Sequence, residues 1–274
     1  MIIWLPSYPK SGNTWVRAFV TAYLYGQNGQ FNFKLLNKIG EFPDHTILGR
    51  FMDSKNFHNL GEVSKHWIKV QELINSNNKN TFLKTHSSLC NINGNLFTNS
   101  ETALAFIYVV RDPRNVALSM SNHFGITQEK SFDIISNERY IIYPSVGNQI
   151  IPSTLVGSWS NHCSSWKNCK SINKIIIKYE DLINNTESTF GKIINFLAKY
   201  TEVKYDEEKL INSINSTKFD NLKKLEDKHG FNMGQKNKFF HLGEKNDWKT
   251  LLDTKISSKI NNKFKIEMKE LGYN

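Results

Sequence analysis

Residues 5–19 read LPSYPKSGNTWVRAF, and this stretch decides the fold. The apolar run 2–5 predicts a buried strand, and the apolar residues from Trp15 onward recur at the spacing of a helix. A glycine turn between a strand and a helix can hold an anion, because the first N–H groups of the helix lack partners. Lys10 precedes Gly12 here, whereas the lysine follows the glycine in the loop spelled G-x-x-x-x-G-K-[ST]. A plain strand–helix turn with a surface lysine is the alternative.

Composition and charge are those of an ordinary globular chain. The 274 residues are 39% hydrophobic, and no linker or repeat divides them, so we expect a single domain over 1–274. The net charge of +10 comes mainly from scattered lysines. A nucleic-acid-binding surface would instead need a basic stripe with interleaved aromatic residues, so we expect no nucleic-acid partner.

Membrane and redox signals are weak. The longest apolar run, 103–110, is too short to cross a bilayer, and no signal peptide is expected. Cys90, Cys163 and Cys169 have no metal-ligand spacing and are expected to be reduced thiols. We therefore expect a cytoplasmic protein without a transmembrane segment, and we leave a homodimer open.

The periodicity of the apolar residues predicts the order of the elements. Strands are expected at 2–5, 80–84, 105–110 and 174–178. Helices are expected at 15–24, 63–74, 113–123, 153–169, 187–200, 206–215 and 256–271. Residues 125–152 fit no period, which is typical of a lid or binding loop. Strands separated by helices predict an α/β fold with a central parallel sheet flanked by helices.

Polar and charged residues follow all four predicted strands, at the sheet edge where open parallel sheets bind their ligands. They are Lys10–Thr14, Lys84–His86, Arg111–Arg114 and Tyr179–Asp181. Asp112 is expected to cap a helix that begins at Pro113, but capping alone would leave the two arginines unexplained. His86 is a candidate general base, and a structural histidine is the alternative.

Six motifs in this order resemble the cytosolic sulfotransferase family, and the chain is identified as a bacterial-like member of it. They are YPKSGNTW (8–15), KTH (84–86), Arg111 with Ser119, YEDL (179–182), Thr217-x-Phe219 and HLGEKNDWK (241–249). The resemblance covers nearly the whole chain. It implies a P-loop nucleoside triphosphate hydrolase/kinase-like fold, and a reaction that consumes 3′-phosphoadenylyl sulfate (PAPS) and releases adenosine 3′,5′-bisphosphate (PAP).

The resemblance also implies which residues form the site. Nucleotide-binding positions would be Lys10, Ser11, Gly12, Asn13, Thr14, Trp15, Arg111, Ser119, Tyr179, Thr217, Phe219, His241, Leu242 and Gly243. His86 would act as general base, while Lys10 and Lys84 would offset the charge of the transition state without a metal. The rings that would surround the adenine are those of Trp15, Tyr179 and Phe219.

The acceptor is expected to be a hydroxyl or amine of a small molecule, lipid or glycoside. Residues 27–62 and 125–152 would select it, because the resemblance is weakest there. Their aromatic residues could line the acceptor site or belong to the core: Phe31, Phe33, Phe42, Phe51, Phe57, Phe124, Tyr140 and Tyr143.

One motif departs from the family pattern, which has Arg-Lys where this chain has His241-Leu242. Loss of a bidentate arginine should weaken the preference for a 3′-phosphate, and the candidates to compensate are Lys236, Lys238 and Lys245. Two alternatives stay open at this point. One is a P-loop-type nucleotide-binding kinase, which should have a lysine directly after the glycine. The other is a degenerate homologue that binds nucleotide without turnover.

Overall fold

The computed structural model describes residues 1–143, 151–231, 239–240, 243 and 246–273. The chain divides into two compact units. The first unit consists of Met1–Tyr8, Gly40–Val110 and Ile134–Ile176, and the second of Pro9–Ile39, Arg111–Asp133 and Ile177–Asn274. The chain therefore passes from the first unit into the second within the loop that follows the first strand. Within the described ranges, no helix is both long enough and apolar enough to span a bilayer.

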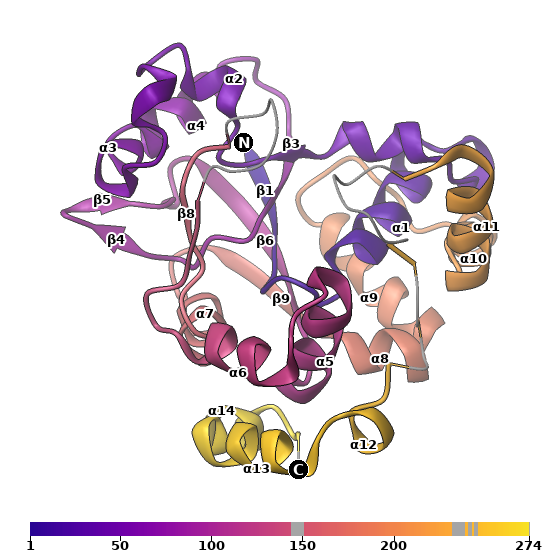
Figure 1. Ribbon diagram of the computed structural model, residues 1–274. Helices are drawn as coiled ribbons and strands as arrows, with labels where there is room; N and C mark the ends of the chain where they lie inside the picture. The colour runs from indigo at the N-terminus through magenta and orange to yellow at the C-terminus, as the bar shows by residue number, and fades with distance from the viewer. Residues whose placement is uncertain (144–150, 232–238, 241–242, 244–245, 274) are drawn as a thin grey trace. The chain divides into compact units, whose positions relative to one another are not determined.

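A five-stranded sheet is the framework of the first unit (Figure 1). Its order is β2-β3-β1-β6-β9, from β1 (Ile2–Pro6), β2 (Gly40–Glu41), β3 (Thr81–Thr85), β6 (Ala103–Val110) and β9 (Asn173–Lys178). β1 pairs in parallel with β3 and β6, and β2 pairs in parallel with β3. β1 and β6 are buried along almost their whole length, as continuous apolar strands of parallel sheets are. The predicted central parallel sheet is confirmed.

The register brings the ends of two strands to the same level. Pro6 of β1 lies opposite Thr85 of β3. One residue further on, the N–H of Ser7 donates to the carbonyl of Thr85 at 3.2 Å, and Ser7 also forms a parallel bridge with Val109. The residues that follow β1 and β3 therefore leave the sheet side by side in the first unit.

Aromatic side chains form the core of the first unit. Phe97 is fully buried, and its ring lies within 5.6 Å of those of Trp4, Phe42 and Trp67, measured between centroids. Trp67 begins α4 (Trp67–Asn75), and Trp166 of α7 (Trp159–Lys167) also contacts Phe97. These rings attach both helices to the sheet.

Short elements complete the first unit. They are α2 (His45–Leu48), η3 (Ser54–Asn56), α3 (Leu60–Ser64), β4 (Asn91–Ile92), β5 (Asn95–Leu96), β7 (Ile141–Ile142) and β8 (Thr154–Leu155). β4 pairs with β5, and β7 with β8, in antiparallel fashion. One helix, α6 (Gln128–Ser136), runs across the sequence boundary between the two units.

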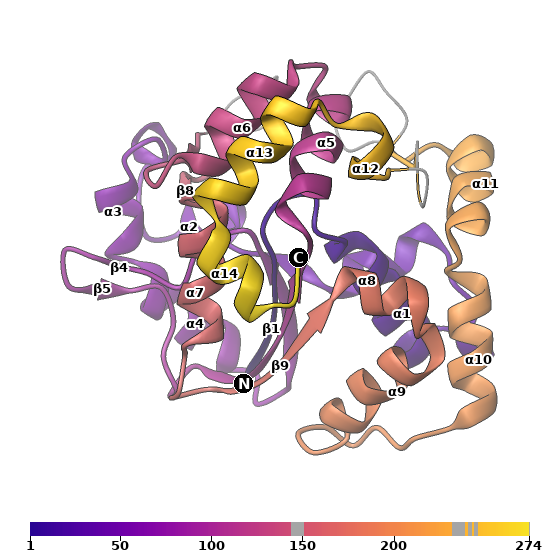
Figure 2. The same ribbon diagram turned by 90° about the horizontal axis from the view of Figure 1, so that it is seen from below.

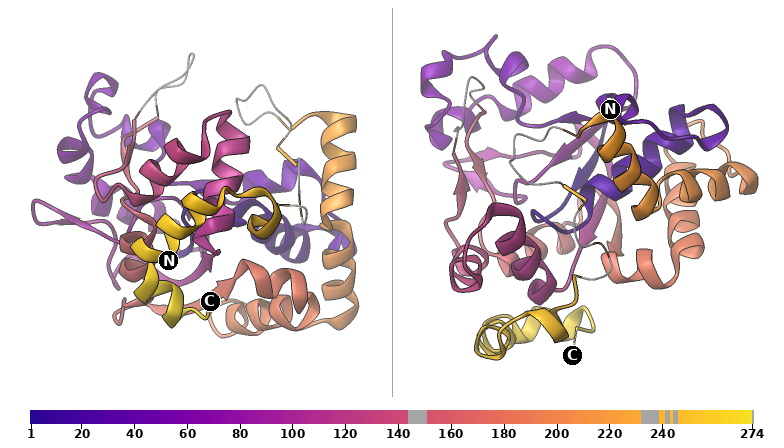
Figure 3. Two further views of the ribbon diagram at one scale, coloured as in Figure 1. Left: turned by 60° about the horizontal axis from the view of Figure 1, so that its bottom comes forward. Right: turned by 45° about the vertical axis from the view of Figure 1, so that its right-hand side comes forward.

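The second unit is mainly helical. It contains α1 (Asn13–Tyr25), η1 (Gln27–Gly29), η2 (Phe33–Lys38), α5 (Pro113–Phe124), α8 (Tyr179–Asn184), α9 (Thr186–Leu197), α10 (Glu207–Ser216), α11 (Phe219–His229), α12 (Trp248–Leu251), α13 (Thr254–Lys263) and α14 (Lys265–Glu270). α1 packs against α9 and α10 (Figures 2 and 3). Phe19 of α1 stacks on Phe190 of α9 with ring centroids 3.9 Å apart.

Three predicted helices are wrong in extent. The helix predicted at 153–169 begins only at Trp159, because β8 precedes it and Gly157, at a φ of 71°, turns the chain before the Ser158 cap. The helix predicted at 63–74 is two helices, α3 and α4, which are separated at residues 65–66. The last predicted helix is likewise divided into α13 and α14 at Phe264. The other predicted strands and helices are confirmed to within three residues at each end.

Residues 125–152 are more regular than predicted. They contain α6, which the sequence did not reveal because its apolar residues are few and lie toward its end. They also contain β7. Residues 144–150 lie outside the described residues.

The aromatic core can be tested at Phe97. Phe97→Ala should lower the free energy of unfolding by about 3–5 kcal/mol, because it leaves a cavity among the surrounding rings. The neighbouring Leu96 is 46% exposed, so Leu96→Ala should change the same quantity by about 0.5 kcal/mol or less. Urea unfolding followed by tryptophan fluorescence measures both, and equal losses would contradict this description of the core.

Candidate functional site

The loop between β1 and α1 has an unusual backbone. Lys10 has a φ of 67°, in the left-handed region that side chains other than glycine seldom adopt, and Gly12 has a φ of 99°. Gly12 is the N-cap of α1, with no side chain to cap the helix and no acidic residue in the first turn. The positive end of the helix is therefore not neutralised by its own sequence, which suits an anion.

Arg111 joins three of the predicted segments within the second unit. Its Nη1 donates to the carbonyl of Lys10 at 3.0 Å. Its guanidinium lies over the ring of Tyr179, with Cζ 4.1 Å from the ring centroid. The segments after β1, β6 and β9 thus contact one another, and Arg111 is buried at their junction.

Gly12 has no room for a side chain. A Cβ at this position would lie 2.9 Å from Cε2 of Tyr179 and closer still to Cδ2 of the same ring. The ring of Trp15 meets that of Tyr179 edge to face, with centroids 6.0 Å apart. The glycine is therefore required both by its backbone angle and by the aromatic ring against it.

Lys10 is held in an environment that disfavours its charge. Burial, and then the neighbouring Arg111 guanidinium, lower the pKa of the Lys10 ammonium to about 7. The Nζ lies 4.6 Å from the centroid of the Phe239 ring. His123 of α5 touches the same ring, and burial followed by the charge of Lys10 lowers the pKa of its imidazole to about 4. An anion placed against Lys10 would restore its positive charge.

Two polar groups within residues 10–15 are buried and lack a hydrogen-bond partner in the described part of the chain. Ser11 Oγ and Trp15 Nε1 have no hydrogen-bond partner among the residues that the structure describes. Unpaired buried donors are uncommon and call for an explanation. A bound ligand that accepts hydrogen bonds would supply one.

A cavity of about 470 Å³ opens beside Arg111 in the second unit. Three predicted nucleotide-binding residues line it, namely Arg111, Tyr179 and Gly243. A Cβ on Gly243, whose φ is 54°, would lie 2.7 Å from Phe219, so the glycine and the ring of the T-x-F motif are in contact. Residues from motifs far apart in the chain therefore line this cavity, and Phe219 lies beside one of them.

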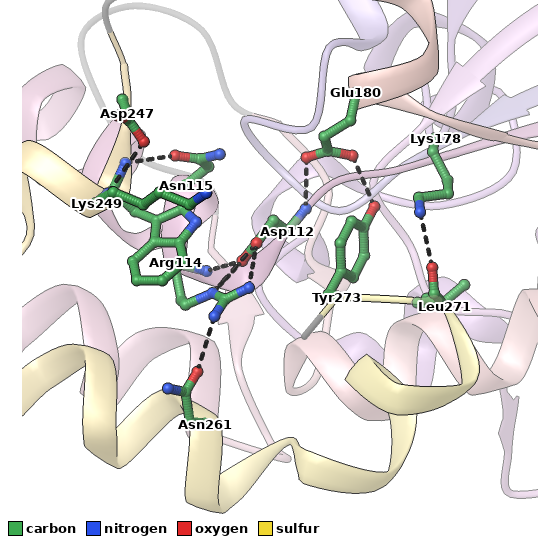
Figure 4. Close-up of polar contacts among 11 residues, drawn as sticks. Asp112, Arg114, Asn115, Lys178, Glu180, Asp247, Lys249, Asn261, Leu271 and Tyr273 are labelled. Atoms are coloured by element: carbon green, nitrogen blue, oxygen red, sulfur yellow. Dashed lines mark hydrogen bonds and ion pairs between the residues drawn. The ribbon is translucent and has the colours of Figure 1, made fainter. Parts of the chain in front are cut away.

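Arg114 makes structural contacts around the start of α5. It lies between Asp112 and Asn261, and its Nη2 pairs with Asp112 Oδ2 at 2.7 Å (Figure 4). Its guanidinium stacks on Trp248, with Cζ 3.8 Å from the ring centroid. Asp112 caps α5 by accepting from the N–H of Arg114, so the predicted cap is confirmed. The cap and its ion pair account for Arg114, which also lines the cavity beside Arg111.

The residue Tyr273 near the C-terminus is hydrogen-bonded to the segments after β6 and β9 through Glu180. The Glu180 carboxylate accepts from the N–H of Asp112 at 3.0 Å and from the hydroxyl of Tyr273 at 2.8 Å (Figure 4). Burial raises the pKa of this carboxyl, against the effect of those hydrogen bonds. No sequence motif indicated Tyr273, because its partner lies 93 residues away.

The remaining predicted nucleotide-binding residues differ in their placement. Ser119 is half-buried on α5, while the hydroxyl of Thr217 is fully buried and donates to the Ser213 carbonyl at 2.6 Å, at the end of α10. Thr217 thus stabilises a helix end. His241 and Leu242 lie outside the described residues, as do Lys236, Lys238 and Lys245.

His86 and Lys84 belong to the first unit. His86 Nδ1 lies 2.8 Å from the carbonyl oxygen of Ser7. Since a carbonyl only accepts, Nδ1 carries the proton and Nε2 is the basic nitrogen. Lys84 is almost buried, and its Nζ pairs with Glu41 Oε1 at 2.6 Å. Sequence reasoning missed Glu41, which is the register partner of Lys84 on β2.

For several of the aromatic residues of segments 27–62 and 125–152, the structure favours the core over the acceptor site. Phe31, Phe42 and Phe57 are buried. Phe33 stacks on Phe231 with ring centroids 4.5 Å apart. Phe124 and Tyr143 are exposed and stay candidates for acceptor binding, together with Phe51 and Tyr140.

Comparison with known protein families identifies the family of this chain. The family model described as the sulfotransferase domain matches residues 2–272. The chain belongs to this family. The family model spans both units, and the expectation of a single domain over 1–274 stays a prediction.

Sulfotransferases of animals are among its relatives. Luciferin sulfotransferase of Photinus pyralis is 24% identical over 79% of this chain and 55% of its own length. The 3-alpha-hydroxysteroid sulfotransferase of Cavia porcellus is 30% identical over 41% of this chain and 37% of its own length. The chain thus matches only about half, or less, of the length of these two relatives.

Solved sulfotransferase-like structures share the fold. A mouse sulfotransferase in complex with PAP has a TM-score of 0.60 at 18% identity, over 97% of this chain and 83% of that one. Retinol dehydratase in complex with androsterone and the inactive cofactor PAP has a TM-score of 0.63 at 15% identity, over 98% and 80%. The predicted sulfotransferase fold is therefore confirmed.

The close contact at Gly12 gives one prediction. Gly12→Ala should displace Tyr179 and weaken PAP binding by about 1.4 kcal/mol or more, a tenfold loss of affinity. Gly125 is a matched control, because its φ is 63° but no atom lies within 4 Å of an added Cβ. Gly125→Ala should leave PAP affinity unchanged. Calorimetric titration measures both, and equal affinities for the two variants would contradict the assignment of this loop to the ligand.

The lowered pKa of Lys10 gives a second prediction. Above pH 7 the free side chain is neutral, so an anion must bind together with a proton, and affinity should fall by as much as about tenfold per pH unit. Below pH 7 the ammonium is already charged and affinity should level off. Calorimetry of PAP binding at pH 8, in buffers of different ionisation enthalpy, should show uptake of about one proton.

Lys10→Met should remove this proton uptake, whereas Lys192→Met, at an exposed position of α9, should not. Equal proton uptake by Lys10→Met and the unchanged protein would show that another group titrates.

Proposed function

We propose that this chain transfers a sulfuryl group from PAPS to a hydroxyl or amine of a small-molecule acceptor. The observation that carries the proposal is the backbone of the loop 8–15. Lys10 and Gly12 both have a positive φ, and the helix that follows has no side-chain cap. Arg111 donates a hydrogen bond to the Lys10 carbonyl. Such a loop offers N–H groups, a lysine and a guanidinium to an anion. Family membership supports a phosphosulfate as this anion.

The residues present fit such a nucleotide. Ser11 Oγ and Trp15 Nε1 are buried polar groups that the described protein leaves unpaired, and both lie in the loop. Gly12 has no side chain, so the backbone beside the Tyr179 ring is open to a close approach by a ligand. We assign the loop 10–15 to the 5′-phosphosulfate, Arg111 and Ser119 to the 3′-phosphate, and the Tyr179 and Phe219 region to the adenine. Two of the neighbouring structures contain PAP, which supports this choice of nucleotide.

The reaction is an in-line substitution at sulfur. A bond forms between the acceptor oxygen or nitrogen and sulfur, and the bond between sulfur and the bridging phosphate oxygen breaks. Negative charge accumulates on that bridging oxygen as PAP leaves. We assign Lys10 to this charge, since an ammonium with a pKa of about 7 gains most from an anionic neighbour.

His86 is the proposed general base. The Ser7 carbonyl fixes the proton on Nδ1, which leaves Nε2 to take the proton of the acceptor. The ring is held at the end of β3, a rigid element, so its direction is set before the acceptor binds. The carbonyl also stabilises the imidazolium that forms.

Lys84 contributes charge in a more limited way. Its pairing with Glu41 compensates the ammonium in the absence of a ligand. Glu41 is exposed, so its carboxylate can be solvated when Lys84 turns toward the transferring group. We therefore assign Lys84 a supporting role beside Lys10 and His86.

Other features stay proposals. The names of two relatives refer to luciferin and to a hydroxysteroid, which supports an acceptor hydroxyl on a small molecule. A cytoplasmic location is supported by Cys90, Cys163 and Cys169, none of which forms a disulfide in the described part of the chain. A homodimer, and the absence of a metal and of nucleic acid from the reaction, stay predictions.

Turnover tests the proposal. The protein, mixed with PAPS and a panel of phenols, alcohols and amines, should release PAP only when an acceptor is present. His86→Ala should lower kcat by about 10²–10⁴-fold and leave the Kd for PAP unchanged, because only the base is lost. His229→Ala, at an exposed position of α11, is the control and should keep full activity.

If the protein binds PAP but releases no PAP from PAPS with any acceptor of the panel, it is a degenerate homologue that binds nucleotide without turnover. Full activity of His86→Ala would remove His86 as the base.

A further inference from the structure

A second histidine lies behind His86 in the first unit. His162 of α7 is fully buried, and no sequence motif includes it. Its Nδ1 lies 2.9 Å from the hydroxyl of Tyr108 on β6. Its ring stacks against that of Tyr108 and meets the ring of Tyr8 edge to face, with centroids 5.7 Å and 5.5 Å away. Burying an imidazole costs free energy unless its nitrogens are hydrogen-bonded, and here only Nδ1 has a hydrogen-bond partner among the described residues.

The face of α7 that carries His162 holds the segment after His86. Trp166 Nε1 donates to the carbonyl of Ser87 at 2.9 Å. The N–H of Leu89 donates to Ser165 Oγ at 3.0 Å. Residues 162, 165 and 166 share one helix face, because they are three and four positions apart. α7 therefore holds residues 87–89, which follow β3 and His86, by hydrogen bonds.

His162 is neutral over the working range of pH. Burial, and then the charge of His86, lower the pKa of its imidazole to about 3, while the backbone of His86 and Ser87 opposes this shift. Burial raises the pKa of both surrounding tyrosine hydroxyls, so they keep their protons. Tyr108 can therefore donate to Nδ1 of His162, which places the ring proton on Nε2.

Nε2 of His162 has no hydrogen-bond partner among the described residues. Ser87, the residue after His86, is held against the same helix face by Trp166. An N–H turned toward those peptides can support them without adding a charge. A charged side chain here would oppose protonation of His86, since two neighbouring cations repel in a buried site.

We propose that His162 is a positioning residue for His86. As a neutral ring oriented by Tyr108, it braces the backbone of His86 and Ser87, so that His86 keeps its Nδ1–H on the Ser7 carbonyl and its Nε2 toward the acceptor. Trp166 completes the support from one turn further along α7. The inference rests on the proposed role of His86 as base, but the geometry it describes exists without any substrate.

Long-range ¹H–¹⁵N spectra of the histidine side chains test the inference without turnover. His86→Gln and His162→Gln assign the two rings. His86 should be the Nδ1–H tautomer, and His162 should stay neutral down to pH 5. In His162→Phe, which keeps the ring volume and removes both nitrogens, the tautomer preference of His86 should weaken and its pKa should shift.

If the His162→Phe variant does not fold, two smaller substitutions around His162 still test the inference. Tyr108→Phe removes only a hydroxyl, and Trp166→Phe removes only the indole N–H beside Ser87. Each should move the His86 signals in the same direction. Val70→Ala, in the core at α4, is the control for lost stability and should leave those signals in place.

Kinetics separate positioning from simple destabilisation. With an active acceptor, His162→Phe should lower kcat by as much as about 100-fold, because a small displacement of the base spoils its alignment with the acceptor. The Kd for PAP should not change. His162→Gln, which keeps an N–H donor, should recover part of the rate.

An unchanged His86 tautomer and pKa in folded His162→Phe would overturn the inference. Failure of the unchanged protein to turn over PAPS would count against the proposed function, and the spectra would still decide the role of His162.

Discussion

The hydrogen bond from Arg111 to the carbonyl of Lys10 is the constraint on which the second unit depends. It holds a lysine in a left-handed conformation that costs about 1–3 kcal/mol when unsupported. With the Lys10 carbonyl engaged and Gly12 turned against Tyr179, the loop ends at an uncapped helix N-terminus. The strain is thus stored where an anion would bind, which is where strained backbones are commonly found.

Charge around the loop of the second unit is limited before any ligand arrives. Burial and the Arg111 guanidinium lower the pKa of Lys10 to about 7, and Arg111 lies over the ring of Tyr179. A buried cluster of fully charged cations would be unstable. An anionic ligand therefore both completes the charge of Lys10 and relieves the cost of burying it, which links affinity to pH.

Local motifs were predictable from the sequence, and nonlocal partners were not. The loop 8–15 and the cap at Asp112 follow from short-range rules of glycine turns and helix ends. Glu41 was missed because its strand has only two residues, and its pairing with Lys84 depends on sheet register. Phe239 and His162 were missed because they contact residues far away in the chain. The Thr217 hydroxyl donates to the Ser213 carbonyl at the end of α10, a local contact that the motif did not indicate, and its place at the nucleotide stays a prediction.

The affinity for PAP, compared with that for adenosine 5′-phosphate, shows whether Arg111 and the loop after β1 hold a nucleotide with a 3′-phosphate. Calorimetry of the unchanged protein should show that PAP binds, and more tightly than the monophosphate. Arg111→Met should weaken PAP binding by about 10- to 150-fold, which corresponds to loss of a hydrogen bond to a charged group. A protein that does not bind PAP, or that binds it equally well with and without Arg111, would contradict the account.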